Sequence, residues 1–179
     1  METYRLVPHP ATPAGKVAAV DVEVIADPAD DILMTFIVSG SVDLLVPEWA
    51  AATRQEGLWQ TTCFELFLKP IGADSYFEYN FSPSTEWAAY RFEAYREGRT
   101  EFQQPVDPFL ERLGGPPAIL QVDLDLSGLP NLPMRMGLCA VIEEKGGRKS
   151  YWALAHPPGK PDFHHPDCFA LELPAADPA

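Results

Sequence analysis

Hydrophobic side chains recur at every second position along much of this chain, and this period constrains the fold more than any other feature. Val20, Val22 and Val24 alternate with acidic residues, as in a β-strand with one buried face. A mostly apolar run follows at 32–38, and the polar sequence DPADD at 27–31 is typical of a turn. The two runs therefore predict a first β-hairpin.

Three aromatic runs in the middle of the chain are rich in residues that favour strands. They are TCFELFL at 62–68, YFEYNF at 76–81 and WAAYRFEAY at 87–95. Short segments of turn-forming residues, KPIGADS and SPSTE, separate them. We expect a three-stranded meander here.

The last third of the chain repeats the pattern. Residues 118–126 alternate again, and the runs 134–143 and 149–155 flank the sequence EKGGRK. Glycine supplies the positive φ that tight turns need, so these two runs predict another hairpin. A short run at 169–173 offers a last strand.

About eight short strands joined by turns predict an all-β fold, an antiparallel β-sandwich with few or no long helices. The 19 prolines agree with this, because proline breaks helices and central strands. A length of 179 residues, 46% of them hydrophobic, is enough for one domain with a real core. We expect a single domain over 1–179, with an ordered core from about 16 to 173.

The charge balance limits the partners. Lys and Arg total 13 against 26 Asp and Glu, which gives a formal net charge of −13. Such a surface repels phosphate backbones and anionic lipid, so we expect neither nucleic acid nor a membrane as partner. The chain has no signal-peptide pattern and no apolar run long enough to span a bilayer. Cys63, Cys139 and Cys168 form no CxxC pair, which favours free thiols in the cytoplasm. The sequence leaves the oligomeric state open.

Polar residues of the expected meander fall on one face. Glu65 has the opposite parity to Phe64 and its apolar neighbours, so its side chain points away from theirs. Trp59 has the parity of Glu65 and would share its face in a continuous strand. Glu78 and Asn80 alternate with aromatic residues in the same way in the next run.

The pairing of these runs decides what the polar face contains. If Leu68 pairs with Ser75 across the turn, Glu65 lies directly opposite Glu78. Two like charges facing each other on a sheet are unfavourable unless a cation or a hydrogen-bonding ligand joins them. Arg91 in the third run is the candidate for that cation. The expected patch therefore consists of Glu65, Glu78, Asn80 and Arg91, with Trp59 and Trp87 at its rim.

The same pattern has a plainer interpretation. Alternating charges on an antiparallel sheet are typical of any solvated face, and tryptophans are more often buried than exposed. An exposed indole beside carboxylates and amides, in contrast, suits a sugar ring, because the C–H face stacks while the hydroxyls form hydrogen bonds. Both interpretations stay open at this point.

A second candidate cluster combines His156 with the sequence DFHHPDC at 162–168. Histidine, carboxylate and thiol groups can ligate a transition metal. The adjacent His164 and His165 in a proline-rich loop cannot easily face one ion, however, and no recognised ligand spacing occurs, so no metal site is predicted. Trp152, on the strand that leads into this loop, is a candidate aromatic wall beside it.

The quoted motifs, together with LW at 58–59 and WALAHP at 152–157, resemble the DOMON-like superfamily, and more narrowly the bacterial group related to family-9 carbohydrate-binding modules. The resemblance runs from about Leu58 to Leu173. It implies a β-sandwich with a site on one side, which binds sugars in some members and haem in others. By position it implies that Trp59 and Glu65 are a sugar clamp and its acidic partner, that Arg91 is an arginine contact and that Trp152 is a second clamp.

The chain lacks the motifs of common enzymes, including GxSxG, a P-loop, GxGxxG after a strand and HExxH. We therefore expect a non-catalytic module that binds a carbohydrate or another small polar ligand, with no cofactor. Three alternatives remain. Haem or a metal is suggested by His156, His164, His165, Met34, Met134 and Met136; a carbohydrate-active enzyme would use Glu65 and Glu78 as an acid/base pair; a protein-interaction domain would expose an apolar patch.

Overall fold

The computed structural model describes residues 1–26, 31–40, 42–113 and 118–175. In these parts of the chain the regular structure is almost entirely β, as the alternation predicts, and the helical elements are two short 3₁₀ turns. Among the described residues there is no helix of the length and hydropathy needed to cross a bilayer. The elements are β1 (Glu2–Pro8), β2 (Ala19–Ala26), β3 (Asp31–Ser39), η1 (Leu58–Gln60), β4 (Cys63–Pro70), β5 (Tyr76–Phe81), β6 (Trp87–Phe92), β7 (Thr100–Glu101), β8 (Phe109–Arg112), β9 (Ala118–Asp125), β10 (Met134–Glu144), β11 (Arg148–Ala153), η2 (Pro166–Cys168) and β12 (Leu171–Leu173).

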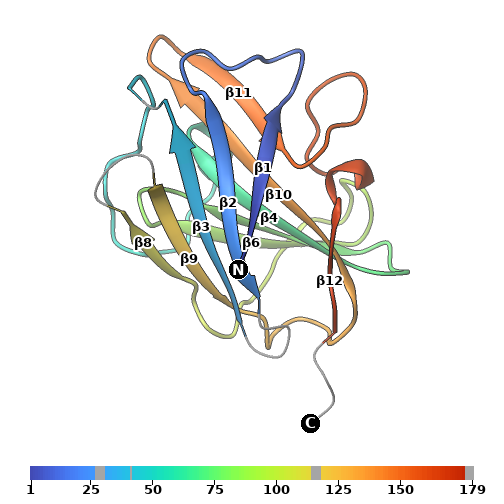
Figure 1. Cartoon of the computed structure of the whole chain (residues 1–179). Coiled ribbons are helices and arrows are strands. Elements are labelled where there is room, and N and C mark those ends of the chain that lie inside the picture. Colours follow the sequence, from blue (N-terminus) through green and yellow to red (C-terminus); the bar gives the residue numbers. More distant parts are fainter. Residues whose placement is uncertain (27–30, 41, 114–117, 176–179) are drawn as a thin grey trace.

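The strands form two layers that face each other (Figure 1). The β4 layer has the order β7-β6-β5-β4-β10-β11, with β12 also paired to β10, and the β2 layer has the order β1-β2-β3-β9-β8. Strand β1 joins them, because residues 2–6 pair with β2 whereas Val7 and Pro8 pair with β11. All these pairings are antiparallel, which confirms the expected antiparallel β-sandwich.

The expected local pairings are also present. Strands β2 and β3 pair as the first hairpin, although residues 27–30 of its expected turn lie outside the described residues. The meander β4-β5-β6 and the hairpin β10-β11 form as expected. The expected start of the ordered core at about 16 is wrong, because β1 is a paired strand. The sequence of β1 does not indicate a strand clearly, because Leu6 is its one buried residue and hydrophobic and polar residues alternate only weakly along it.

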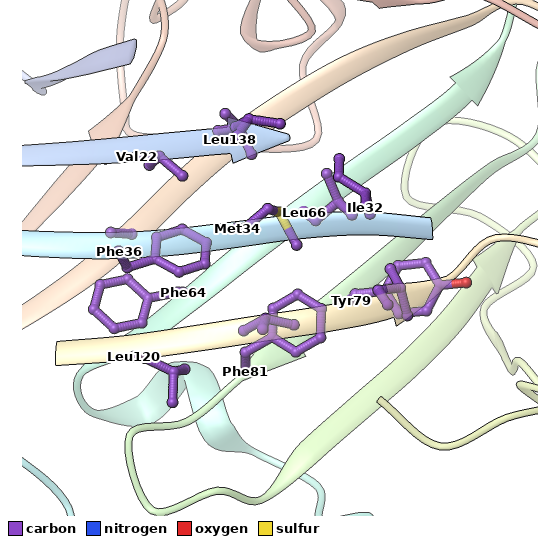
Figure 2. Packing of buried hydrophobic residues seen from close by; sticks show 14 of the residues in the cluster. Val22, Ile32, Met34, Phe36, Phe64, Leu66, Tyr79, Phe81, Leu120 and Leu138 are labelled. Carbon is purple, nitrogen blue, oxygen red and sulfur yellow. The ribbon is translucent and has the colours of Figure 1, made fainter. Parts of the chain in front are cut away.

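The main hydrophobic core fills the space between the two layers (Figure 2). Alternate residues of β4, including Phe64 and Leu66, point into it and meet residues of β3 such as Met34 and Phe36. The rings of Phe36 and Phe64 stack across the layers with their centroids 4.4 Å apart. This arrangement uses one face of each strand of the β4 layer and leaves the other face, here called the outer face, for different contacts.

A second apolar cluster covers part of the outer face, where the chain after β11 folds back over the sheet. Phe67 and Phe92 come from the strands, and Phe163, Cys168 and Phe169 come from the covering segment. Phe67 and Phe169 stack with their centroids 5.6 Å apart. The segment between β11 and β12 is therefore packed onto the sheet as a fixed wall.

Gly137 on β10 allows this close packing. A Cβ atom at this position would lie 2.8 Å from Cδ1 of Phe169 and 3.1 Å from the carbonyl oxygen of Cys168. These separations are shorter than ordinary van der Waals contacts, so a side chain here would push the covering segment away from the sheet.

The segment between β1 and β2 is held by one buried carboxylate, that of Glu144 at the end of β10. Its oxygens accept hydrogen bonds from the backbone N–H groups of Gly15, Lys16 and Val17 at 2.7, 2.5 and 3.2 Å. The three donors lie far from Glu144 in sequence, so this contact fixes the first loop against the rest of the sandwich.

We expect Glu144→Ala to lower the free energy of unfolding by about 2–3 kcal/mol, because it leaves three backbone donors without their charged acceptor. Urea denaturation followed by circular dichroism measures this change. Glu143→Ala on the same strand is the matched control, since the Glu143 carboxylate makes none of these contacts. Equal stability of the two variants would contradict the assigned role.

Candidate functional site

A pocket of about 430 Å³ opens on the outer face of the β4 layer. Its floor is formed by side chains of β4, β5 and β10, among them Glu65, Glu78 and Val141. Its walls come from three separate connections: the turn η1 before β4, the connection between β6 and β7, and the segment between β11 and β12. These walls contribute Trp59, Arg96, Arg99, Asp162, Phe163 and His164.

The two glutamates of the floor share a face, as their parity predicts, but they do not pair directly. Glu65 lies opposite Asn80, and Glu78 lies opposite Phe67. The expected pairing of Glu65 with Glu78 is therefore wrong by two residues. The physical reason is the longer connection, because β4 continues to Pro70 and the turn closes through a hydrogen bond from the Ala73 N–H to the Pro70 carbonyl.

Both carboxylates are buried although they line a pocket, with exposed fractions of 4% for Glu65 and 6% for Glu78. Burial raises the pKa of Glu65 well above its ordinary value, and the nearby charge of Glu78 raises it further, while Arg96 acts in the opposite direction. Burial also raises the pKa of Glu78, and a hydrogen bond from the Asn80 amide to Oε1 at 2.8 Å partly offsets this. Asn80 thus holds the Glu78 carboxylate in place through this hydrogen bond.

Trp59 forms one wall from the turn η1. Gly57, with φ of +78°, starts this turn, and Leu58 is buried in the outer-face cluster. The indole of Trp59 is consequently turned outward and is 38% exposed at the pocket. Because β4 begins only at Cys63, the expected continuous strand through Trp59 is wrong, yet the turn brings Trp59 and Glu65 to the same pocket.

The cations of the pocket are Arg96 and Arg99, not Arg91. Arg91 pairs with Phe77 and so lies on the opposite face of the sheet from Glu65 and Glu78, where it is exposed. The expectation that it joins the glutamates is wrong, because the pairing of β5 with β6 gives it the other parity.

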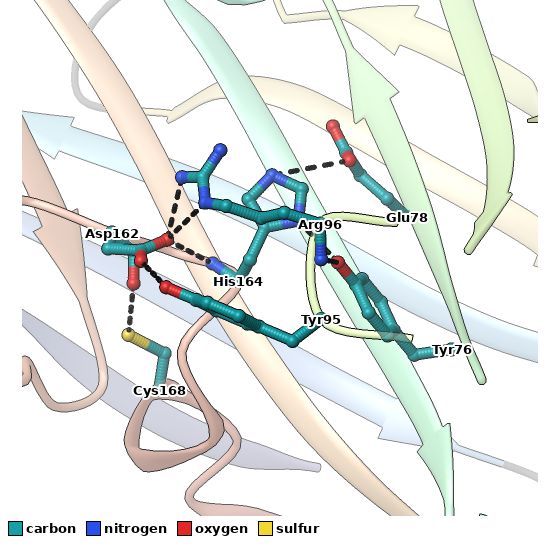
Figure 3. A network of polar contacts seen from close by, with 7 residues as sticks. All are labelled: Tyr76, Glu78, Tyr95, Arg96, Asp162, His164 and Cys168. Carbon is teal, nitrogen blue, oxygen red and sulfur yellow. Dashed lines mark hydrogen bonds and ion pairs between the residues drawn. The ribbon is translucent and has the colours of Figure 1, made fainter. Parts of the chain in front are cut away.

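Arg96 connects two walls of the pocket (Figure 3). It has φ of +57° in a tight turn between Ala94 and Glu97, which aims its side chain at the segment after β11. Its Nε and Nη2 donate to Oδ1 of Asp162 at 3.2 and 2.7 Å, and the hydroxyl of Tyr95 donates to Oδ2. Burial opposes ionisation of Asp162, but these hydrogen bonds prevail and lower its pKa.

His164 is held by a chain of hydrogen bonds next to Glu78. The Arg96 backbone N–H donates to the Tyr76 hydroxyl at 3.2 Å, and that hydroxyl lies 2.8 Å from Nδ1 of His164. Burial raises the pKa of Tyr76 to about 12, so its hydroxyl keeps its proton. Burial, and then the charge of Arg96, lower the pKa of His164 to about 4. The imidazole is therefore neutral near pH 7, with Nδ1 at the Tyr76 hydroxyl and Nε2 3.7 Å from Oε2 of Glu78.

The other expected site residues lie elsewhere. Trp87 and Trp152 are each 2% exposed and belong to the core between the layers, so Trp152 does not form the second wall. His156 contacts the carbonyl oxygen of Val7, and Nδ1 of His165 accepts from the backbone N–H of Asp167. His165 lines a neighbouring hollow with Tyr95; the adjacent histidines indeed face different surroundings.

Two clusters that the sequence separates thus form one site. Glu65 and Glu78 of the meander and His164 of the later loop line the same pocket. Arg96 and Arg99 were missed, although their position in the polar sequence REGR after the third strand was a usable signal.

The residues of the haem or metal alternative do not converge. Met34, Met134 and Met136 are buried between the layers, on the side of the sheet away from His164. Within residues 1–26, 31–40, 42–113 and 118–175, no three His, Cys, Asp or Glu side chains are grouped as metal ligands.

Solved structures that resemble this one include two whose descriptions name carbohydrate binding. A structure from Bacteroides uniformis, described as a "putative carbohydrate-binding protein", has a TM-score of 0.62 and 19% sequence identity, over 93% of this chain and 83% of that one. A family-9 carbohydrate-binding module from Caldicellulosiruptor kristjanssonii, in complex with glucose, has a TM-score of 0.46 and 13% identity, over 83% and 72%. Neither a protein-family model nor a curated protein sequence matches the chain. The first likeness establishes the fold.

We expect Glu65→Gln to raise the free energy of unfolding at about pH 7.5 by about 1 kcal/mol, because it removes a buried charge that destabilises the folded state. The folded protein binds the Glu65 proton more tightly than the unfolded chain, so the advantage of the variant shrinks as the pH falls toward 4.5. Urea denaturation at several pH values measures it. Glu172→Gln, at a 61% exposed carboxylate, is the control; a variant at Glu65 that is less stable than the wild type would refute the assignment.

The protonation of His164 makes stability depend on pH in the opposite direction from that of Glu65. The unfolded chain protonates this residue near pH 6.5, whereas the folded protein does so only near pH 4. Its contribution to stability is present above pH 6.5 and is lost as the pH falls to about 4. Between about pH 7.5 and pH 5, the wild type should lose about 2 kcal/mol more stability than His164→Gln. Parallel pH dependences of the two proteins would show that His164 is not buried in its neutral form.

Proposed function

We propose that this chain is a non-catalytic module that binds a carbohydrate or another small polar ligand in the pocket of Trp59, Glu65 and Glu78. The observation that carries the proposal is an outward-turned indole beside two buried carboxylates in a space of about 430 Å³. That volume lies within the range of small-molecule sites.

The chemistry of the pocket matches both sides of a sugar. An indole supplies a flat apolar surface for the C–H face of a pyranose ring. The carboxylates accept hydrogen bonds from its hydroxyls, and the guanidinium groups of Arg96 and Arg99 supply donors. Because the floor is largely withdrawn from water, each such hydrogen bond gains strength.

The walls are fixed before any ligand arrives. The hydrogen bond from Arg96 to Asp162 joins the β6–β7 connection to the segment between β11 and β12. The stacked rings of Phe67 and Phe169 hold that segment on the sheet. A pocket built in this way loses little conformational entropy on binding.

The comparisons give this proposal a context. The Bacteroides uniformis structure, which has the same fold, is the one described as a "putative carbohydrate-binding protein". We propose the same class of ligand here, and membership of the DOMON-like superfamily remains part of the proposal. The pocket itself, rather than the likeness, supplies the residues by which the proposal is tested.

We expect Trp59→Ala to weaken binding of the best sugar at least about tenfold, since it removes the stacking surface. The probes are glucose, galactose, xylose and their β-linked disaccharides, and isothermal titration measures the affinity. Trp49→Ala is the matched control, because Trp49 is 71% exposed and does not line the pocket.

Fluorescence gives a second readout, because Trp87 and Trp152 are buried in the core and Trp59 is the indole at the pocket. A sugar that stacks on Trp59 changes the emission of the wild type and of Trp49→Ala, but not that of Trp59→Ala. Absence of heat and of an emission change with every probe would count against the proposal, as would equal effects of the two tryptophan variants.

A further inference from the structure

Acidic side chains outnumber basic ones in the lining of the pocket. The carboxylates of Glu65, Glu78 and Asp162 line it, against the guanidinium groups of Arg96 and Arg99. His164 adds no positive charge near neutral pH, because burial lowers its pKa to about 4.

Both guanidinium groups are engaged away from the two glutamates. Arg96 directs Nε and Nη2 to Asp162. Arg99 lies over the ring of Tyr90, 4.7 Å from its centroid, and its Nη2 is 3.7 Å from the carboxylate of Glu56. The arginines therefore lower the negative potential of the floor at a distance but do not form hydrogen bonds with it.

Glu65 is the carboxylate that lacks a partner. It is 4% exposed and lines the pocket. In the described part of the chain no side chain or backbone group donates a hydrogen bond to it, whereas Glu78 receives one from Asn80. A largely buried carboxylate without a hydrogen-bond donor is unfavourable, and the position of Glu65 in the pocket lining lets a bound group supply that donor.

The register brings Glu65 and Glu78 within reach of one small group. Glu65 pairs with Asn80, and Glu78 is the next residue along β5 on the same face. Such diagonal neighbours have Cα atoms about 7–8 Å apart, and the long glutamate side chains can converge from that separation. A single group placed between them contacts both carboxylates.

We propose that the pocket selects a sugar that presents a protonated amine to Glu65 and Glu78, that is, an amino sugar of the glucosamine type. This inference rests on the proposed function. An ammonium group carries a full charge and three hydrogen-bond donors, whereas a hydroxyl carries one donor and no charge. The amine replaces a hydroxyl with little change in size, so the discrimination comes from charge and not from the shape of the pocket.

Trp59 is compatible with this ligand. Its exposed indole offers the stacking surface that any pyranose requires, and the negative face of the ring attracts a sugar that carries a positive charge. The same wall therefore serves a neutral and a cationic sugar, and Glu65 is the residue that separates them.

The experiment compares glucosamine, glucose and N-acetylglucosamine by isothermal titration at about pH 6.5, where the amine keeps its proton. The proteins are the wild type, Glu65→Gln and the surface control Glu172→Gln. We expect the wild type and the control to bind glucosamine at least about tenfold more tightly than glucose. In Glu65→Gln the affinity for glucosamine should fall at least about tenfold further than the affinity for glucose, because both sugars lose a carboxylate acceptor but only glucosamine loses a counter-charge.

The outcomes separate the two proposals. Glucose bound as tightly as glucosamine by the wild type overturns the cation inference and leaves carbohydrate binding in place. A preference for glucosamine that persists in Glu65→Gln also overturns it, because a group other than Glu65 then recognises the ammonium charge. Thermal stabilisation by Ca²⁺ alone, abolished in Glu65→Gln, would make the floor a metal site and overturn it as well. If the wild type binds none of the sugars, the proposed function itself is refuted.

Discussion

The pairing of β4 with β10 is the interaction on which the rest of this structure depends. Eight consecutive residues of β4, from Cys63 to Pro70, pair with β10 across a long separation in sequence. With this pairing in place, alternate side chains of β4 and its neighbouring strands lie on two opposite faces of one continuous layer. One face packs against the β2 layer, and the other becomes the platform on which the pocket is assembled. Without β10 in this place, the meander would have no continuous outer face wide enough to hold three walls.

The walls depend on contacts that are specific rather than merely apolar. Gly137 leaves space for Phe169 and so lets the segment after β11 lie close on the sheet. Arg96, in a left-handed backbone conformation, reaches across to Asp162 and ties that segment to the connection after β6. The left-handed region is unfavourable for arginine, and the two hydrogen bonds with Asp162 offset this. The pocket is thus preorganised by interactions on its rim.

The floor shows the opposite balance. Glu65 and Glu78 are buried together, and burial raises the pKa of each, which means that their charges oppose folding. The surrounding sandwich tolerates them because the core between the layers is predominantly apolar and is packed by stacked rings such as Phe36 and Phe64. Local destabilisation within a well-packed scaffold is typical of binding sites, where groups are kept ready for a ligand rather than for each other.

The sequence by itself determined the all-β class, the two hairpins, the meander and the face on which Glu65, Glu78 and Asn80 lie. These follow from a period of two, which is a local property of the chain. It did not determine the register of β4 on β5, the placement of Arg91 on the other face, the burial of Trp152 or the approach of His164 to Glu78. Those depend on turn length and on which distant segments pack together, and the free energy of such contacts exists only once the two layers and the covering segment have come into place.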